Sequence, residues 1–329
     1  MHLTRREIGK LALAGVPAAW MSSATAGAQS RSTPRFGGLS VGVIAPYSFR
    51  AMGALDAEAL LRHIVQLGLG ATELQSPPAE AFVGAPLPPP RPVPFGQPLS
   101  PEQAAVQRAA RETLRQWRQA APAGAFSAYR ELRKTFESAG VAIQLIKFDD
   151  LSADWPDAEI DYAFTVAKTL GCRGITCEPP LSHTRRLGRF AEKHGLMLGY
   201  HGHTAVADVE AFARPGSWEQ AFFYSKYNGA NIDIGHFTAG NSRSPVEFIR
   251  EYHDRITNLH LKDRRVNNGP NVPWGEGDTP IREILQLMKR ERYTFMATIE
   301  LEYPIPPGSD TMTELARCVR FVEDALADA

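Results

Sequence analysis

The sequence has few cysteines, no net charge and no long apolar segment. Its 329 residues contain only three cysteines, Cys172, Cys177 and Cys318, which is an odd and sparse set that excludes a disulfide framework. We expect them to be buried apolar residues. Lysine plus arginine and aspartate plus glutamate both number 36, so no electrostatic attraction to nucleic acid or to an anionic membrane is expected.

Residues 1–28 have the features of an export signal. Arg5-Arg6 and Lys10 precede a mildly apolar stretch from Leu11 to Trp20, and Ala26-Gly27-Ala28 resembles a cleavage site. The pattern is typical of a twin-arginine signal, with an ordinary basic helix as the alternative. Since the stretch is too short to span a bilayer, it predicts a periplasmic or secreted protein without a stable membrane anchor.

From residue 39 onward, short apolar runs alternate with amphipathic helical stretches. Strict alternation predicts a parallel sheet with helices outside it, and eight units favour a single-domain (β/α)8 TIM barrel over residues 37–329. An open doubly wound sheet is the alternative, but Ala45-Pro46-Tyr47-Ser48 after the first strand is no glycine-rich phosphate turn. The expected strands are residues 39–45, 71–75, 141–148, 174–178, 197–203, 230–234, 256–262 and 295–302.

One stretch interrupts the alternation between the second strand and its helix. Residues 76–120 contain a proline cluster from Pro86 to Pro94 and then a polar helical stretch from Pro101 to Gln119. In a barrel this connection lies on the face where the strands end. We therefore predict an inserted lid or wall over the mouth, with a flexible decoration as the alternative.

Polar side chains stand at the ends of five expected strands, where a strand buried on both faces would favour valine or isoleucine. Because the carboxyl ends of barrel strands meet at one mouth, we expect these side chains to converge. They are Glu178, then His201 and His203, then Asp233 with His236 in the next turn, then His260 and Lys262, and finally Glu300 and Glu302.

The alternation of side chains along a strand narrows their roles. Residues two apart share a face, so one of each strand-end pair can reach a central ion while the other stands nearer the rim. Carboxylate and imidazole ligands together suit one divalent ion of Mn, Co, Mg or Zn. The alternatives are a core histidine for His203, a helix cap for Asp233 and a solvated rim carboxylate for Glu302.

Several ordered motifs between about Gly171 and Pro304 give the chain a family resemblance. They are Gly199-Tyr200-His201-Gly202-His203, Asn231-Ile232-Asp233-Ile234-Gly235-His236, His260-Leu261-Lys262-Asp263-Arg264, Pro273-Trp274-Gly275-Glu276-Gly277-Asp278 and Ile299-Glu300-Leu301-Glu302-Tyr303. With them the chain resembles the xylose isomerase-like TIM barrel superfamily, the sugar phosphate isomerase/epimerase family. Such isomerases hold a metal with Glu, Asp, His and Glu from successive strands.

The resemblance implies a role for each strand-end residue. Asp233, His260 and Glu300 match the last three metal ligands, while the place of the first glutamate falls on His201 and Glu178 offers a further carboxylate. His236 matches a residue that contacts substrate, and we expect His203 and Glu302 to contact it as well. Glu178, Glu300 and Lys262 are the expected catalytic residues.

The implied chemistry is removal of a proton next to a carbonyl to give an enediolate, and return of a proton by a second base. Glu300 is one such group, and the second is Glu178 or His201. The leading hypothesis is therefore a metal-dependent isomerase or epimerase acting on a small sugar or keto-sugar. A 3-keto-glycoside lyase and a non-catalytic exported sugar-binding protein are the alternatives, and the sequence leaves a homo-oligomer open.

Overall fold

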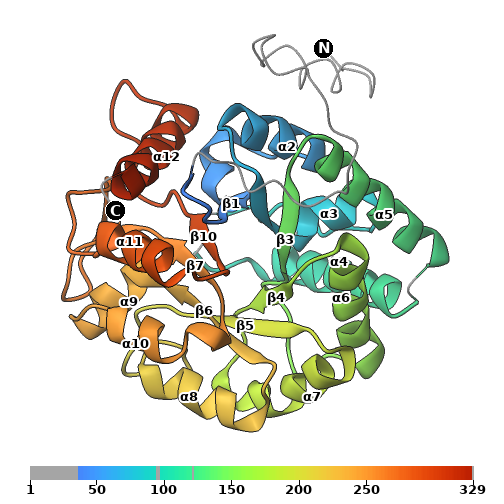
Figure 1. The fold of residues 1–329 in the computed structure, drawn as a ribbon. Helices are drawn as coiled ribbons and strands as arrows, with labels where there is room; N and C mark the ends of the chain where they lie inside the picture. Colours follow the sequence, from blue (N-terminus) through green and yellow to red (C-terminus); the bar gives the residue numbers. More distant parts are fainter. Residues whose placement is uncertain (1–35, 94–96, 121, 328–329) are drawn as a thin grey trace, which may run out of the picture.

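The computed structural model describes residues 36–93, 97–120 and 122–327, and the expected signal at residues 1–28 lies outside them. Eight parallel strands form a closed barrel inside a ring of helices (Figure 1), in the order β1, β10, β7, β6, β5, β4, β3, β2. The predicted single-domain (β/α)8 barrel is thus confirmed. The strands are β1 (Val41–Ala45), β2 (Ala71–Gln75), β3 (Ala142–Lys147), β4 (Gly174–Cys177), β5 (Met197–His201), β6 (Asn228–Asp233), β7 (Ile256–Leu261) and β10 (Met296–Ile299).

Amphipathic helices cover the outside of the barrel and bury one face against it. In the first of them Leu60, Leu61 and Ile64 are buried, as their helical spacing predicts. The helices are α2 (Ala57–Gln66), α5 (Ala123–Ser138), α6 (Asp157–Leu170), α7 (Thr184–His194), α8 (Pro215–Tyr224), α9 (Ile234–Asn241), α10 (Val246–Glu251), α11 (Ile281–Glu291) and α12 (Thr311–Ala327), with short 3-10 turns η3 (Tyr47–Met52), η4 (Leu181–His183) and η5 (His253–Arg255).

The barrel interior is filled in layers of different character. At the amino-terminal end, Ala71, Leu145 and Met296 form a small apolar cluster separate from the main core. Gly42 lies beside them, where a Cβ would come within 2.6 Å of Met296 Sδ, so only glycine fits there. Above this plug, the side chains that point inward are polar and buried, namely Glu73, Thr176, Asn231, Asn258 and Thr298.

Six strands end before the predicted positions, and in four of them, β4, β5, β7 and β10, candidate residues therefore lie just beyond the sheet. The pairing of β5 stops at His201, because the next inward residue, His203, donates its backbone N–H to the carbonyl of Phe212 in its own loop. The residues that follow their strands in this way are Glu178, His203, Lys262, Glu300 and Glu302. Their backbones are thereby placed at the mouth by the strands that precede them.

Helix α9 was not predicted, since the sequence Ile234–Asn241 shows no amphipathic pattern. It starts directly after β6, and Asp233 caps it by accepting a hydrogen bond from the backbone of His236 at 2.7 Å. A short hairpin of β8 (Asp263–Arg264) and β9 (Asn271–Val272) also escaped prediction. There the Asp263 carboxylate accepts backbone hydrogen bonds from Gly275 and Gly277.

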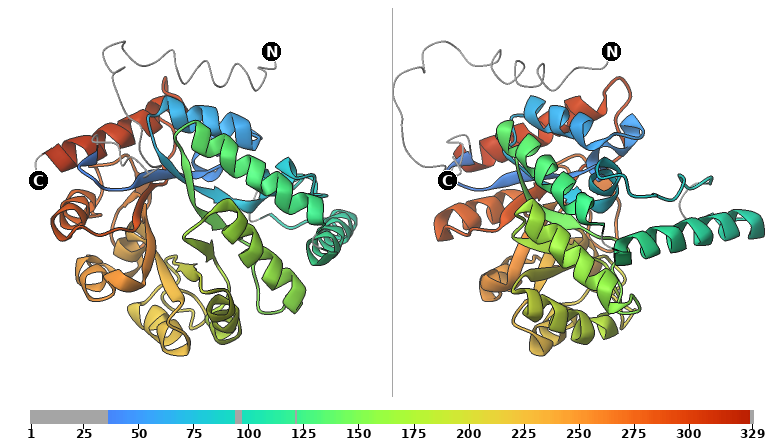
Figure 2. Two further views of the ribbon diagram at one scale, coloured as in Figure 1. Left: turned by 45° about the vertical axis from the view of Figure 1, so that its right-hand side comes forward. Right: turned by 90° about the vertical axis from the view of Figure 1, so that its right-hand side faces the viewer.

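The connection between β2 and α5, which we call the β2–α5 connection (residues 76–122), contains α3 (Ser76–Phe82) and α4 (Pro101–Ala120). The right-hand view of Figure 2 shows α4 projecting beyond the body of the barrel. Its carboxyl-terminal end is fixed by buried Arg118, whose guanidinium donates to both oxygens of Glu80 at 2.8 and 3.0 Å. The same guanidinium donates to Asp150 at 3.1 Å and to Glu159 at 3.3 Å, so it joins α3, α4 and α6.

All three cysteines are buried and free, as predicted. None of the helices in the described part of the chain combines the length and the apolar character needed to cross a membrane.

Replacing Arg118 with methionine should lower the free energy of unfolding, measured by urea denaturation, by about 3–5 kcal/mol, because Glu80 would be left buried without its cation and Glu159 would keep only Arg115. Replacing Lys134 with methionine is the control, since its ion pair with Glu131 is solvent-exposed and is worth about 0–1 kcal/mol. Equal effects of the two changes would show that the buried ion pairs do not hold α4.

Candidate metal centre

Two overlapping groups of side chains at the mouth have ligand atoms close enough to share one ion. His201, Asp233 and His260 offer three atoms within 4.8 Å of one another, and His201, His203 and His236 offer another three. The first group is entirely buried, whereas the side chain of His203 is 51% exposed. The buried group is the better candidate, because a metal ligand must be held in place by its surroundings.

Three buried polar atoms around this group make no hydrogen bond of good geometry with the described residues: Asp233 Oδ2, His260 Nδ1 and Glu300 Oε2. They are nevertheless close together, with His260 Nδ1 2.9 Å from Glu300 Oε2. Lys262 Nζ lies 2.8 Å from Asp233 Oδ2 and 3.0 Å from Glu300 Oε2, in the geometry of ion pairs rather than directed hydrogen bonds. Buried polar atoms are normally satisfied, so these residues fit a bound cation.

A chain of buried hydrogen bonds fixes how both histidines face the mouth. Asn231 Nδ2 donates to Asn258 Oδ1 at 2.7 Å, which leaves Asn231 Oδ1 to accept from His201 Nδ1. The ring of His201 therefore turns Nε2 and its lone pair outward. Burial and the nearby Lys147 hold the pKa of His201 well below its usual value, so the ring is neutral, as a metal ligand must be.

Glu73, in the middle of β2, orients the second histidine and was missed by the sequence reasoning. Its Oε2 lies 2.6 Å from His260 Nε2 and accepts from Asn258 Nδ2 at 2.7 Å, while its Oε1 accepts from Thr176. This contact turns His260 Nδ1 toward Glu300 and Asp233. Burial opposes the charged ring, but Glu73 and Glu300 outweigh burial and raise the pKa of His260 to about 10 in the metal-free protein.

Lys262 occupies the side of the mouth formed by β7 and β10. Its ammonium contacts Glu302 as well as Asp233 and Glu300, and Tyr47 donates to the other oxygen of Glu302 at 2.7 Å. Burial disfavours the charged amine, but these three carboxylates outweigh it and hold the pKa of Lys262 well above its usual value. Burial also raises the pKa of Asp233 to about 6, although Lys262 opposes the shift.

His236, on α9, lies between two cations. Arg264 Nη1 donates to its Nδ1 at 2.6 Å, and Lys262 Nζ lies 3.2 Å from its Nε2. Burial and Lys262 hold the pKa of His236 well below its usual value, so the ring is neutral. Its Nε2 stands 3.9 Å from Glu302 Oε2, so two of the three residues assigned to substrate contact are neighbours at the rim.

Glu178 lies on the other side of the mouth and outside both metal groups. It contacts buried Lys147 and is 3.1 Å from His203 Nε2 and 4.0 Å from His201 Nε2. Burial favours its neutral form, but Lys147 and His203 outweigh burial and hold its pKa far below the usual value. The arrangement presents an ionised carboxylate, a potential base, beside the buried ligand group.

The barrel topology sets Glu178 and Glu300 opposite each other. Glu178 directly follows β4 and Glu300 directly follows β10, and in the ring of eight strands β4 and β10 are separated by three strands on either side. A small molecule bound at the centre of the mouth would therefore have one carboxylate on each side.

The residues that sequence reasoning missed carry a common signal. Glu73, Lys147 and Asn258 are polar residues at inward positions of strands that were otherwise expected to be buried. Lys147 is the last residue of β3, so the polarity of a strand end marks it in the same way as the other mouth residues. Glu73 sits one layer deeper, and only the pairing across the barrel shows what it contacts.

The chain belongs to the xylose isomerase-like TIM barrel family, whose model matches residues 81–321. No curated protein sequence matches the chain significantly. Among solved structures, the probable 3-DHS dehydratase AsbF of Bacillus anthracis is 12% identical with a TM-score of 0.57, and the match covers 86% of this chain and 98% of that one.

Two further solved structures share the fold. The 3-keto-D-glucoside 4-epimerase YcjR of E. coli is 10% identical with a TM-score of 0.55, and the match covers 88% of this chain and 100% of that one. The IolI protein, with a bound zinc atom, is 12% identical with a TM-score of 0.56, over 88% of this chain and 99% of that one. At such low identities the likeness shows a common fold.

Replacing Glu73 with glutamine should lower the affinity for Zn²⁺ or Mn²⁺ by about 10–100-fold, because His260 loses the carboxylate that orients its ring while the shape of the barrel is kept. Competition with a chelator measures the affinity. Asp233→Ala is the positive control and should abolish binding, and exposed His253→Ala is the negative control. Wild-type affinity in Glu73→Gln would remove the orienting role from Glu73.

Proposed function

We propose that the protein is a metal-dependent sugar isomerase or epimerase that moves a proton at a carbon next to a carbonyl group. The observation that carries the proposal is the pair of carboxylates, Glu178 and Glu300, that follow opposite strands around a buried ligand group. Epimerisation needs one group to remove the proton from one face of the carbon and another to return it on the other face. The YcjR epimerase, of the same fold, supports this assignment.

His201, Asp233, His260 and Glu300 would hold the metal, one divalent ion. When bound, it would stabilise negative charge that develops on the carbonyl oxygen of the substrate. Mn, Co, Mg and Zn all accept this donor set, and the zinc bound in IolI favours zinc among them.

The residues around the ligand group have separate tasks. Glu178 removes the proton from the carbon, and the electron pair of that C–H bond moves toward the carbonyl oxygen to give an enediolate. Glu300, from the opposite strand, takes up a proton from solvent and delivers it to the other face of the carbon, while Glu178 releases its proton to solvent. Lys262 donates a hydrogen bond to a substrate oxygen, and His203, His236 and Glu302 bind hydroxyl groups at the rim.

In the metal-loaded protein, solvent deuterium should enter the carbon next to the carbonyl of a keto-sugar, as measured by NMR over a broad panel of keto-sugars. Glu178→Gln should slow this exchange by about 10²–10⁴-fold, the usual contribution of a positioned general base, while the metal content stays at the wild-type level.

Glu247→Gln is the matched control, because the Glu247 carboxylate is largely exposed and lies outside the metal groups. Loss of metal from Glu178→Gln would instead make Glu178 a ligand. Absence of exchange with every sugar of the panel would exclude the proposed reaction.

Elimination is the second candidate, since the same proton removal expels a leaving group on the next carbon when one is present. The dehydratase AsbF, which shares the fold, favours this alternative. Release of a free aglycone from a 3-keto-glycoside would identify a lyase. Tight sugar binding that is unaffected by removing the metal would identify a non-catalytic binding protein.

We also propose that the protein is exported by the twin-arginine route, on the basis of Arg5-Arg6 and Ala26-Gly27-Ala28. Expressed in a bacterium with that route, the periplasmic form should begin at Gln29 by N-terminal sequencing. Changing both arginines to lysine keeps the charge and should leave the protein in the cytosol. Periplasmic recovery of the double-lysine variant at the wild-type level would contradict the proposal.

A further inference from the structure

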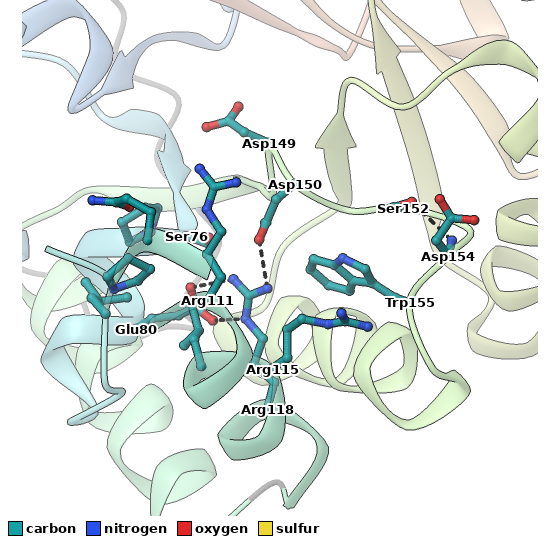
Figure 3. A pocket seen from close by; sticks show the side chains of 15 residues that line it. Ser76, Glu80, Arg111, Arg115, Arg118, Asp149, Asp150, Ser152, Asp154 and Trp155 are labelled. Atoms are coloured by element: carbon teal, nitrogen blue, oxygen red, sulfur yellow. Dashed lines mark hydrogen bonds and ion pairs between the residues drawn. The ribbon is translucent and has the colours of Figure 1, made fainter. Parts of the chain in front are cut away.

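A pocket of about 670 Å³ lies between the β2–α5 connection and the loop that follows β3 (Figure 3). Its volume falls within the usual range of small-molecule sites, about 300–1,000 Å³. It is lined by apolar side chains and by charged ones, among them Pro77, Leu87, Leu114, Arg111, Asp149 and Asp150. None of these residues has a role in the reaction proposed above.

The pocket is adjacent to the mouth through a short series of contacts. Asp149 lies two residues after the end of β3, and its Oδ1 lies 3.5 Å from the ammonium of Lys147, which contacts Glu178. Its Oδ2 accepts from the side chain of Gln75, at the end of β2, at 2.7 Å. The pocket and the proposed base therefore share one rim of the barrel, at the ends of β2, β3 and β4.

Two of the three arginines that line the pocket form ion pairs that hold the fold together, and the third forms none among the described residues. Arg118 is held by Glu80, Asp150 and Glu159, and Arg115 donates to Glu159 at 3.1 Å. Arg111 is exposed, and its guanidinium has no ion-pair or hydrogen-bond partner among the described residues. In Figure 3 its side chain extends toward Asp149, so its five N–H donors are available at the pocket.

We infer that this pocket is a second subsite, which holds the part of a substrate beyond the reacting sugar ring, so that the substrate is a glycoside rather than a free monosaccharide. The inference rests on the proposed function for what happens at the first subsite. A second sugar ring or an aryl aglycone has apolar faces for Leu87 and Pro77, and the hydroxyl edge of a sugar suits the guanidinium of Arg111 and the carboxylate of Asp149. Because Arg118 anchors α4, the subsite is preformed and little ordering opposes binding.

Isothermal titration of the Zn²⁺-loaded full chain tests the subsite without requiring turnover. The probes are methyl β-D-glucopyranoside, which fills one subsite, and cellobiose and p-nitrophenyl β-D-glucopyranoside, which reach the second. The wild type should bind at least one of the two larger probes about tenfold more tightly than the methyl glycoside, as expected for about 1.4 kcal/mol of added contact. Preference for cellobiose would indicate a second sugar, and preference for the p-nitrophenyl compound an aryl group.

Arg111→Ala, which removes the free donors, and Leu87→Trp, which fills the pocket, should each abolish this preference and leave binding of the methyl glycoside unchanged. Arg108→Ala is the matched control, an exposed arginine one turn away on α4 and outside the pocket lining. Equal wild-type affinity for all three probes, or a preference that survives both variants, would overturn the subsite and leave the proposed reaction untouched. A preference lost in both variants, in a protein that exchanges no deuterium with any sugar, would support the subsite and exclude the reaction.

Discussion

The mouth of the barrel depends on the orientation of two buried histidine rings. His201 and His260 can present lone pairs to one point only if their other nitrogens are engaged below, and a continuous chain of hydrogen bonds through Asn231, Asn258 and Glu73 does this. A barrel interior is normally filled by branched apolar residues. Here a polar layer takes their place directly beneath the mouth. Both side-chain oxygens of Glu73 accept hydrogen bonds, which offset the cost of burying the charge of this carboxylate. The layer gives up apolar packing to fix ring orientation, which is what a metal ligand requires.

With the rings fixed, the topology distributes the remaining tasks around the mouth. The buried group that could hold a metal comes from β5, β6 and β7, which are consecutive in the ring; Glu300 follows the neighbouring β10, and Glu178 follows β4 across from β10. Asp233 shows how one residue serves two purposes, because Oδ1 caps α9 while Oδ2 faces the mouth beside Lys262 Nζ. The helix-cap alternative weighed from the sequence and the ligand role therefore describe different oxygens of the same carboxylate.

The barrel and most of the mouth residues could be predicted from the sequence, because both follow from patterns within short segments of the chain. Alternating strands and helices determine the architecture, and polarity at a strand end is visible one strand at a time. The roles of Glu73 and Asn258 were not predicted because they depend on partners that are distant in sequence. The hydrogen bond between these two residues, for example, joins positions 185 residues apart. Helix α9 escaped because it is buried nearly all round and has no amphipathic period. The strand ends were placed too late because the chain leaves the ladder for loop contacts, such as that of His203 with Phe212.

The β2–α5 connection supplies apolar surface, of which the candidate metal centre has little. The mouth is built from charged and polar side chains, which orient a ligand well but bury little apolar surface on binding. Leu87, Pro77 and Leu114 bring such surface to the rim beside Asp149.

An apolar contact alone would attach α4 without fixing its direction, since the hydrophobic effect is not directional. The bidentate pairing of Arg118 with Glu80, with Asp150 and Glu159 on the remaining nitrogen, is directional, and it sets where the helix stands relative to the strand ends. Because α4 is held in this way, the pocket has its shape before a ligand binds. Binding in the pocket therefore does not carry the entropy cost of closing a lid.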